Sequence, residues 1–558
     1  MDRKAFIVVI ICFAILFGWQ ALVNHLWPPP PPGAEPKPGV AQTNVVEKPA
    51  PPAEIKPAPP VEPPKPRPPE KTVTLENESV RVIITSYGGG IKDVLLKKWT
   101  VSPDNPDLVT LNLFGPEPVL ALADWPGADS NAVYGLQQAS PTNAVVTCET
   151  AGGIKIAKEF RLGADSVIGC RMRFENAGQQ TQQTPAFGVA LGTAAQLDAL
   201  DDPTFVSLDY WDGGPLSVTG RAKASYNAAS SLASKPLAAT NTVRWAAVNN
   251  RYFAMVLTPA EPAAGIAGKE FDLPLSLTPK AKTPPQGVRG WLRLNAVSVE
   301  PGAAVTRDFK LYAGPKEFRR LAALGDHQEE VMQFGMWGRI SEALLWGLTT
   351  VHRIIPNYGI AIIIITIIIK LLFWPIQAIS TRSMKKMQEL QPHLAKLKEK
   401  YPDDPQKQQQ EMMKLYREHK VNPMSGCLPL LVQIPVFFAL YTMLRTAIEL
   451  RGARFLWIRD LSQPDTILSL GDSAFLQLNP LPLIMCATTI WQQKLTPTTT
   501  ADPTQQRMMM LMPVMFLFLF YTVSSGLLLY WTVQNLLSIL QQWLALRDQK
   551  AAAAPAKR

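Results

Sequence analysis

The stretch that decides the fold runs from Pro356 to Gln377 and reads PNYGIAIIIITIIIKLLFWPIQ. This apolar run is long enough to cross a bilayer as one helix. It carries one charge, Lys370, six residues before Ile376 and therefore about 9 Å inside the nearer helix end. Thr366 lies one turn earlier on the same face. A charge within a span indicates a functional site, although a lysine can also extend along its helix to the headgroups.

The composition indicates a protein with both membrane-embedded and water-soluble parts. Of the 558 residues, 47% are hydrophobic and 18% are charged, and the net charge is +10. Because the basic residues lie beside apolar segments, the charge predicts membrane topology and no specific nucleic-acid recognition. The five cysteines form no CxxC pair, so we expect no metal site, redox dithiol or cofactor.

The N-terminal part of the chain is predicted to be an anchor followed by a spacer. Residues 1–27 combine a basic start with an apolar run but lack a small-residue cleavage site. We therefore expect an uncleaved transmembrane helix, with a cleaved signal peptide as the alternative. Arg3 and Lys4 predict that the N-terminus is cytoplasmic. Residues 28–70 contain 18 prolines, which predict an extended linker.

Residues 71–325 are predicted to form an all-β domain. Short runs rich in β-branched residues, such as SVRVIIT and IKIAKEF, are separated by glycine pairs and triplets. This pattern is typical of a β-sandwich. Cys148 and Cys170 lie in this domain. If the strands around them form a meander, the two cysteines lie on strands about 9.6 Å apart, which is too far for a disulfide.

Two helical regions flank the apolar span at 356–377. Residues 334–355 predict an amphipathic helix in the membrane interface, with a core helix of the β domain as the alternative. Residues 378–423 predict a cytoplasmic hairpin of two helices, about 377–400 and 405–421, which turns at YPDDP. Ten Lys and Arg against six Asp and Glu in 380–422 indicate the cytoplasmic side. Candidate contact residues of the hairpin are Met384, Lys385, Lys386, Met387, Met412, Lys414 and Arg417.

Residues 424–546 are predicted to hold spans three to six with short loops. The segment 508–546 is too long for one crossing, and Ser524-Ser525-Gly526 divides it into a hairpin of two spans. The other two spans are expected at 424–444 and 475–491. Basic loops and a basic tail at 547–558 predict six spans, both termini in the cytoplasm, and the β domain on the far side.

Several segments resemble the YidC family of membrane protein insertases. The sequence NPMSGCLPLLVQIPVFFALYTML (422–444) resembles the third-span signature of this family, and SGLLLYWTVQN (525–535) resembles its last span. KLTPTTTADPTQQRMMMLMPV (494–514) is similar to its loop between the fourth and fifth spans. The resemblance covers about 334–547. The β domain is more loosely similar to the periplasmic domain of two-membrane bacterial members, in SYGGGIKDVLL, RWAAVNNRYFAMVLTP and YAGPKEF.

This resemblance implies a membrane protein with an α-helical six-span bundle, in which an N-terminal anchor precedes a five-span insertase core. It also implies a periplasmic β-supersandwich similar to sugar mutarotases. The core would enclose a hydrophilic groove that is open to the cytoplasm and to lipid. The implied function is insertion and folding of inner-membrane proteins, alone or with the Sec translocon. The implied partners are nascent inner-membrane proteins, the ribosome, the Sec translocon and the lipid bilayer.

The family also implies residue roles. It usually has arginine at the position of Lys370, and its substrate-contacting positions match Thr366 and Trp531. Independently of the family, the few polar residues within the later spans are expected to face a cavity or a protein interior. The candidate groove residues are Lys370, Thr366, Gln433, Trp531, Gln534 and Asn535. Five methionines between 508 and 515 are a further candidate surface for passengers, or ordinary lipid-facing side chains.

Two other classes of protein were considered. A secondary transporter usually needs carboxylates within its spans and often has inverted repeats, and neither pattern is visible in the sequence. A sugar-active enzyme in the β domain would commonly use a histidine with a carboxylate, and residues 71–315 contain no histidine. We therefore expect no enzyme activity and a location in the bacterial inner membrane.

Overall fold

The computed structural model describes residues 68–103, 105–199, 201–217, 220–277, 283–401, 404–419, 421–422, 428–469, 477–495 and 503–553. The expected anchor at 1–27 and nearly all of the expected linker at 28–70 lie outside the described residues. The same holds for the last five residues of the expected tail.

Alternation of apolar and polar side chains produces the strands of the β domain. In β8 (Ile154–Leu162), the side chains of Ile156 and Phe160 are buried, whereas those of Lys155 before Ile156 and Arg161 after Phe160 are exposed. Residues two apart face the same side of a sheet, so one face of the strand forms core. Lys158 occupies one of these inward positions and is fully buried.

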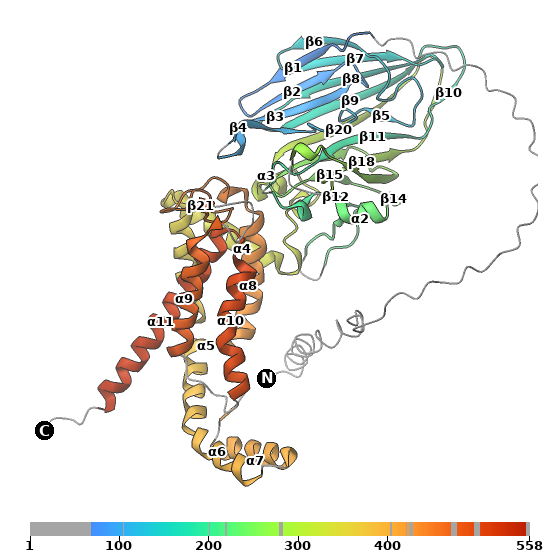
Figure 1. Ribbon diagram of the computed structural model, residues 1–558. Coiled ribbons are helices and arrows are strands. Elements are labelled where there is room, and N and C mark those ends of the chain that lie inside the picture. Colours follow the sequence, from blue (N-terminus) through green and yellow to red (C-terminus); the bar gives the residue numbers. More distant parts are fainter. Residues whose placement is uncertain are drawn as a thin grey trace, which may run out of the picture. The chain divides into compact units, whose positions relative to one another are not determined.

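Three antiparallel sheets form the β domain (Figure 1). The nine-stranded sheet has the order β13 (Ser225–Ala228), β12 (Ser207–Trp211), β15 (Trp245–Asn249), β16 (Phe253–Pro259), β20 (Ala304–Pro315), β9 (Val167–Asn176), β8, β7 (Asn143–Glu149), β6 (Gly135–Ser140). The five-stranded sheet has the order β14 (Leu237–Ala239), β17 (Gly265–Asp272), β18 (Gln286–Leu294), β11 (Phe187–Ala194), β5 (Leu122–Ala123). The four-stranded sheet has the order β1 (Thr72–Glu76), β2 (Val80–Thr85), β3 (Gly90–Ser102), β4 (Asn105–Leu111).

Smaller elements complete this domain. They are the two-stranded pair β10 (Gln182–Gln183) and β19 (Ser298–Val299), the helices α2 (Ala229–Ser234) and α3 (Phe318–Ala323), and 3-10 turns at Pro203–Phe205, Leu275–Leu277, Gln328–Met332 and Gly335–Trp337. The predicted meander is confirmed, because β8 pairs with both β7 and β9. Cys148 on β7 and Cys170 on β9 are therefore separated by a strand, and both thiols are free, as predicted.

Helices make up most of the chain after the β domain. They are α4 (Gly338–Ile354), α5 (Tyr358–Glu389), α6 (Gln391–Lys400), α7 (Pro405–Glu418), α8 (Leu428–Thr446), α9 (Pro480–Leu495), α10 (Pro503–Phe520) and α11 (Ser525–Ala553). A 3-10 turn at Ile448–Leu450 and the strands β21 (Leu468–Ser469) and β22 (Gln477–Leu478) lie between α8 and α9. In Figure 1, α5, α8, α9, α10 and α11 run side by side, and α6 and α7 follow the end of α5.

The amphipathic helix α4 packs against α8 and α5. Leu345 and Leu348 are buried, whereas Trp346 is 63% exposed and Ile354 is 78% exposed. The Ser341 hydroxyl donates a hydrogen bond to the Ala439 carbonyl of α8 at 3.0 Å. The helix therefore has one face against the spans and one apolar edge exposed.

Three predicted helix boundaries were wrong. The helix of the second span does not end near Gln377 but continues as α5 to Glu389, because the helix accommodates Pro375 and no further glycine or proline occurs before Pro392. The expected hairpin helix at 377–400 is instead broken at Leu390, where Pro392 lacks the amide that would continue the hydrogen bonding. The expected fourth span at 475–491 becomes α9, which begins at Pro480, because Gln477 and Leu478 pair with Leu468 and Ser469 as strands.

The split of 508–546 into two helices is confirmed, since α10 ends at Phe520 and α11 begins at Ser525. By length and composition, one helix of the described residues, Tyr358–Glu389, is long and apolar enough to cross a membrane. Leu431–Thr446 and Leu511–Phe520 are shorter apolar helices. The count of six spans stays a prediction.

Arginines connect the β domain to the chain between α8 and α9. The Arg251 guanidinium donates to the carbonyls of Arg445 and Ser462, at 2.7 and 3.1 Å. Arg451 donates to the carbonyls of Thr100 and Val101. Side chains add to this contact, since Arg445 pairs with Asp202 and Arg451 lies over the rings of Tyr252 and Phe253.

Candidate functional site

The lysine of the apolar helix is buried and has a partner on another helix. Lys370 is 4% exposed, and its ammonium group donates a hydrogen bond to the Ser538 hydroxyl of α11 at 2.7 Å. Ser538 donates in turn to the Gln534 carbonyl at 2.8 Å. The hydroxyl is thereby oriented with its lone pairs toward the lysine. The Lys370 side chain lies against α11 and not along the surface of α5.

Thr366 lies one turn before Lys370 and is fully buried. Its hydroxyl donates to the Ile362 carbonyl at 2.7 Å, a bond that threonine commonly forms within a helix. The four-residue spacing therefore places Thr366 and Lys370 on the same buried face of α5. The Thr366 hydroxyl therefore donates its proton within α5 and not to a neighbouring helix.

A polar stripe on α11 faces the neighbouring helices. Tyr530, Gln534 and Ser538 are four residues apart and therefore share a face. The Gln433 side chain of α8 donates to the Tyr530 hydroxyl at 2.6 Å. Lys370 of α5 contacts the same stripe at Ser538. Polar side chains from α5, α8 and α11 thus meet along one side of α11.

A second polar contact joins α11 to α9. The Asn535 amide donates to the hydroxyls of Thr488 and Thr489, at 3.2 and 2.9 Å. Two buried atoms nearby on α11, Gln534 Oε1 and Thr532 Oγ1, have no hydrogen-bond partner among the described residues. Buried polar atoms in native proteins are almost always bonded. These two atoms therefore have capacity for a polar guest or for water.

Trp531 lies in an aromatic cluster. Its ring is 5.2 Å from Phe437 of α8, and 5.6 and 5.3 Å from Phe516 and Phe520 of α10, measured between ring centroids. Such rings form an apolar surface with well-defined edge-to-face contacts. Trp531 therefore belongs to the apolar contact of α8, α10 and α11, while Thr366 belongs to the buried face of α5.

Sequence reasoning missed four residues that the structure joins to the candidate groove. They are Tyr530, Ser538, Thr488 and Thr489. Tyr530 and Ser538 stand four residues on either side of Gln534, so helical spacing from a known candidate was a usable signal. Nothing in the sequence pairs Asn535 with the two threonines of α9.

The helical pair α6 and α7 has a small apolar core of its own. Met387, Leu390, Leu394, Tyr416 and Val421 are buried there, with Met412 and Leu415 packed beside them. Lys386, Lys414 and Arg417 are exposed, and Met384 and Lys385 are partly exposed. Lys414 pairs with Glu411 at 2.5 Å. The exposed basic side chains therefore surround a core of few residues.

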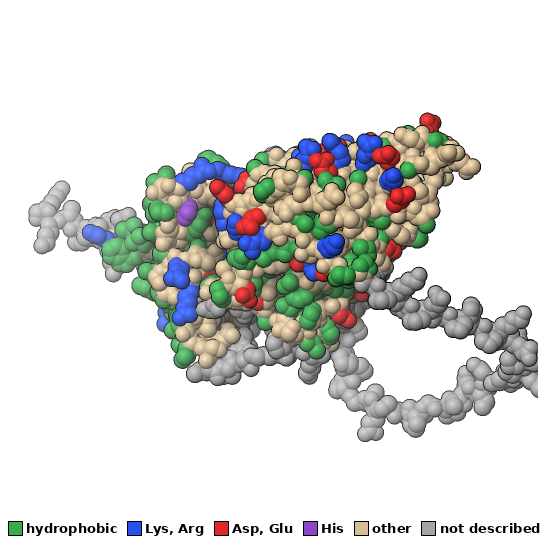
Figure 2. Space-filling view, turned by 90° about the horizontal axis from the view of Figure 1, so that it is seen from above, with side chains coloured by type: hydrophobic (Ala, Val, Ile, Leu, Met, Phe, Trp, Pro, Cys, Tyr) green, Lys and Arg blue, Asp and Glu red, His purple; other side chains and the backbone are tan. Residues whose placement is uncertain are grey.

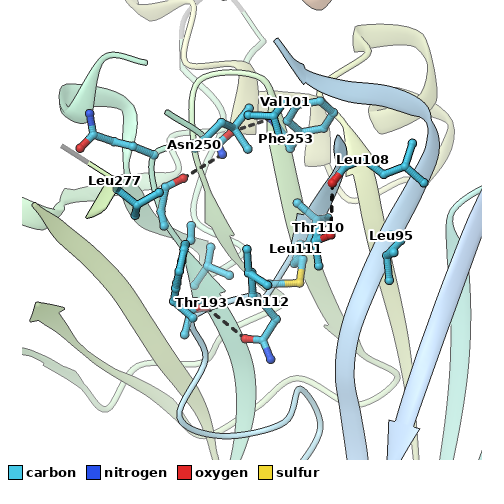
Figure 3. Close-up of a pocket in the computed structure, with 18 of the residues that line it drawn as sticks. Leu95, Val101, Leu108, Thr110, Leu111, Asn112, Thr193, Asn250, Phe253 and Leu277 are labelled. Atoms are coloured by element: carbon cyan, nitrogen blue, oxygen red, sulfur yellow. Dashed lines mark hydrogen bonds between the residues drawn. The ribbon is translucent and has the colours of Figure 1, made fainter. Parts of the chain in front are cut away.

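The β domain contains a cavity of about 490 Å³. Figure 3 shows Leu95 and Leu108 across this cavity from Leu277, with Asn112 and Thr193 at its far end. The Asn112 amide donates to the carbonyls of Lys92 and Glu117, so it holds the chain and is not offered to a ligand. The residues that line the cavity include one carboxylate and no histidine. This lining lacks the acid–base pair that sugar chemistry commonly uses.

The surface charges of the β domain occur in both signs. Figure 2 shows acidic and basic side chains interspersed over the visible face. Several form ion pairs, among them Arg171 with Asp308 at 2.9 Å and Arg307 with Glu261 at 2.6 Å. On this face the charges therefore do not form the single-sign patch that nucleic-acid binding requires. Within the part of the chain that the structure describes, no cluster of residues suits a metal ion.

Comparisons with known proteins agree on one family. A family model described as 60Kd inner membrane protein matches residues 350–552, and one described as YidC periplasmic domain matches 72–347. The membrane protein insertase YidC of Geobacter sp. strain M21 is 34% identical over 485 residues, which cover 85% of this chain and 85% of that protein. The one from Oleidesulfovibrio alaskensis is 32% identical over 575 residues, 98% of this chain and 99% of that protein.

Among solved structures, a crystal structure of an active YidC insertase with its first transmembrane domain resolved is 19% identical, with a TM-score of 0.35. The match covers 85% of this chain and 92% of that one. The sequence relatives extend over both the β domain and the helices, at identities above 30%. The chain belongs to the YidC family of membrane protein insertases.

Proposed function

We propose that this chain inserts and helps to fold inner-membrane proteins through a hydrophilic groove between α5, α8, α9 and α11. The observation that carries the proposal is that polar groups on these helices bond across to one another, at Lys370, Gln433 and Asn535. Lipid tails offer such groups no partner, so a shared polar interior stabilises them within a membrane.

Lys370 is the proposed attractor for acidic passenger segments. A cation attracts a carboxylate more strongly in a medium of low dielectric constant than in water. An ammonium group has three donors, and the described residues provide one acceptor, Ser538. The remaining donors are available to a passenger. Gln534 Oε1 and Thr532 Oγ1 provide acceptors for its backbone amides.

The proposed topology has six spans, both termini in the cytoplasm and the β domain in the periplasm. Basic side chains favour the cytoplasmic side, which assigns α6 and α7 to that side. Their exposed Lys386, Lys414 and Arg417 suit the phosphate backbone of a ribosome or an acidic nascent chain. The Sec translocon is the proposed partner for passengers with large translocated domains.

The test is insertion of a short passenger into proteoliposomes that contain the purified chain. The translocated tail of the passenger carries zero, one or two acidic residues. Lys370→Arg should insert all three forms, because charge and reach are kept. Lys370→Ala should lose insertion in proportion to tail charge, and Lys370→Glu should fail on acidic tails because like charges repel.

The matched control is Lys235→Glu, which changes an exposed lysine of the β domain by the same charge. It should insert every passenger as the parent does. Crosslinkers at Thr366 and Trp531 should capture the apolar segment of the passenger. If the alanine variant shows no dependence on tail charge and neither position crosslinks, the groove mechanism is wrong for this chain.

A further inference from the structure

A tight turn between α8 and α9 exposes two large apolar side chains. Phe455 and Ile458 exchange both of their backbone hydrogen bonds, at 3.0 and 2.8 Å, so that Leu456 and Trp457 form a two-residue turn. We name residues 454–459 the anchor turn. Leu456 is 76% exposed and Trp457 is 42% exposed. Apolar side chains of this size at the tip of a water-exposed turn gain nothing from the rest of the protein.

The backbone conformation of Leu456 is unusual for a leucine at the first position of such a turn. Its φ is 51°, in the left-handed region. Two-residue turns with positive φ at the first position strongly favour glycine, asparagine or aspartate. A leucine there is strained, and its exposure means that packing within the chain does not offset the strain. An apolar environment outside the chain would offset it.

Trp457 is oriented by the helix that follows. Its indole N–H donates to Asp465 Oδ2 at 3.0 Å, and the same oxygen accepts the backbone N–H of Leu481 at 2.7 Å. Leu481 is the second residue of α9. Tryptophan with one satisfied polar edge and an apolar body is enriched at membrane–water interfaces. Through Asp465, the anchor turn is thus held beside the first turn of α9.

Two further helix ends hold the anchor turn. Phe455 packs so closely on Gly359 of α5 that a Cβ at this glycine would lie 2.2 Å from the Phe455 ring. The Gly526 amide of α11 donates to the Leu461 carbonyl at 2.8 Å. Gly359 and Gly526 are each the second residue of their helix. The anchor turn therefore lies where α5, α9 and α11 all begin.

Basic side chains flank the tip. Arg454 and Arg459 lie one residue outside the bridge on either side, and both are exposed. Neither has an ion-pair partner among the described residues. Residues opposite each other across a hairpin are about 5 Å apart, and like charges at such positions repel. An anion between them would remove this repulsion.

From these observations we infer that the anchor turn inserts Leu456 and Trp457 into the lipid headgroup region, while Arg454 and Arg459 bind the phosphates of anionic phospholipids. The helix ends set the depth of the tip, the apolar pair provides the burial, and the arginines provide the charge match. The inference rests on the proposal that α5, α9 and α11 span the membrane.

The experiment places a solvatochromic fluorescent amino acid at position 456 of the full-length chain in nanodiscs. Its emission is quenched by brominated acyl chains from the lipid side and by iodide from the water side. The matched control carries the same probe at Leu275, a 49% exposed leucine in a 3-10 turn of the β domain. We expect lipid quenching at 456 and iodide quenching at 275.

A second experiment tests the role of lipid charge by comparing nanodiscs with and without anionic phospholipid. With the probe at 456, anionic lipid should deepen the tip and shift emission to the blue. Each arginine near an anionic surface changes partitioning by about fivefold, so the double variant Arg454→Gln, Arg459→Gln should lose this shift. Free phosphate should not reproduce the shift, because it brings no acyl chain to the tip.

Leu456→Gly separates anchoring from folding. Glycine suits the positive φ of this position, so the melting temperature in detergent should be equal or higher, which would show that folding does not require the Leu456 side chain. Iodide quenching at 456 equal to that at 275, in chains whose spans label as transmembrane, overturns the inference and leaves the proposed function standing. Spans that do not label as transmembrane overturn both.

Discussion

Two buried lysines show how differently the β domain and the helical groove treat charge. Lys158 of the β domain donates to the carbonyls of Gly88 and Leu120, both at 3.0 Å, and lies 4.8 Å from the centre of the Tyr134 ring. Lys370 of the groove has one hydroxyl partner among the described residues, 2.7 Å away. The Lys158 ammonium is surrounded by carbonyl acceptors, whereas the Lys370 ammonium has N–H donors without a partner among the described residues.

The difference is the one expected between a structural charge and the passenger-binding charge proposed for Lys370. A buried ammonium with its acceptors in place fixes the loops that supply them. Lys316 of the β domain follows the same rule, with Asn249 Oδ1 at 3.1 Å and the Asn250 carbonyl at 3.2 Å. A buried ammonium with spare donors costs free energy until a guest arrives, which suits transient binding of a passenger.

The largest expected effect tests whether the helical part carries the function. Deletion of 384–415 removes most of α6 and α7, which share only a small core with the rest of the chain. We expect insertion to be abolished while the spans stay folded, because the exposed basic surface that is proposed to collect passengers is gone. The measurement is passenger insertion at matched protein level, with span folding checked by protease resistance. Insertion at the parental rate would reduce α6 and α7 to a connector.

The next prediction sharpens the contrast between the two lysines. Lys158→Met leaves the Gly88 and Leu120 carbonyls without a donor and should lower the free energy of unfolding of the β domain by about 1–3 kcal/mol. Lys370→Met removes a membrane-embedded charge whose hydroxyl partner keeps its own acceptor, so stability should be unchanged or higher by about 1 kcal/mol. Pulse proteolysis of the full chain in detergent measures both. Equal destabilisation by Lys158→Met and Lys370→Met would mean that the two lysines do not differ in what they contribute to stability.

Sequence reasoning found the elements whose signals are local. Alternation along β8 and the Ser524-Ser525-Gly526 break were sufficient to predict strands and the α10–α11 hairpin, because each depends on neighbouring residues. The partners of Lys370 and Asn535 were not predictable, since they depend on which face of α11 turns toward α5 and α9. That rotation is set by packing between helices.

The helix boundaries failed for a related reason. The end of a membrane span is a change of solvent, and a helix has no need to stop there. Pro375 lies within α5 and does not end it, and no glycine or proline follows before Pro392, so α5 continues to Glu389. Strand pairing delays the start of α9 to Pro480. Such pairing between short segments is decided by contacts distant in sequence.

The pH dependence of stability should also differ between the two regions. Burial lowers the pKa of Lys158 and of Lys316 from 10.5 to about 8. Between these values the unfolded chain binds more protons, so the free energy of unfolding of the β domain rises with pH, by at most about 1.4 kcal/mol per unit for each lysine. Pulse proteolysis at about pH 8 and pH 9.5 should show a smaller rise in Lys158→Met than in the parent. Identical slopes would mean that Lys158 keeps its proton in the folded state up to about pH 9.5, as it does in the unfolded chain.

The smallest effect on insertion is expected for the deletion that removes the most residues. Deletion of 71–310, which leaves α4 in place, removes nearly all of the β domain but no residue of the candidate groove. It breaks the bonds of Arg251 and Arg451 with backbone carbonyls, the ion pairs of the β domain with Arg445 and Glu342, and the apolar cluster that the β domain shares with α4. Carbonyls at helix ends can bond to water once the β domain is gone.

We therefore expect the deletion variant to insert passengers within about threefold of the parent, a loss of less than about 1 kcal/mol. The comparison uses a short passenger without a large translocated domain, at matched protein level in proteoliposomes. Arg251→Gln is the matched control, because it breaks part of the same contact and keeps the domain. A stably expressed deletion variant with no insertion, beside an active Arg251→Gln variant, would assign the β domain a direct part in insertion. The polar groups of the cavity in Figure 3 are hydrogen-bonded within the β domain, which argues against a direct part of this domain in insertion.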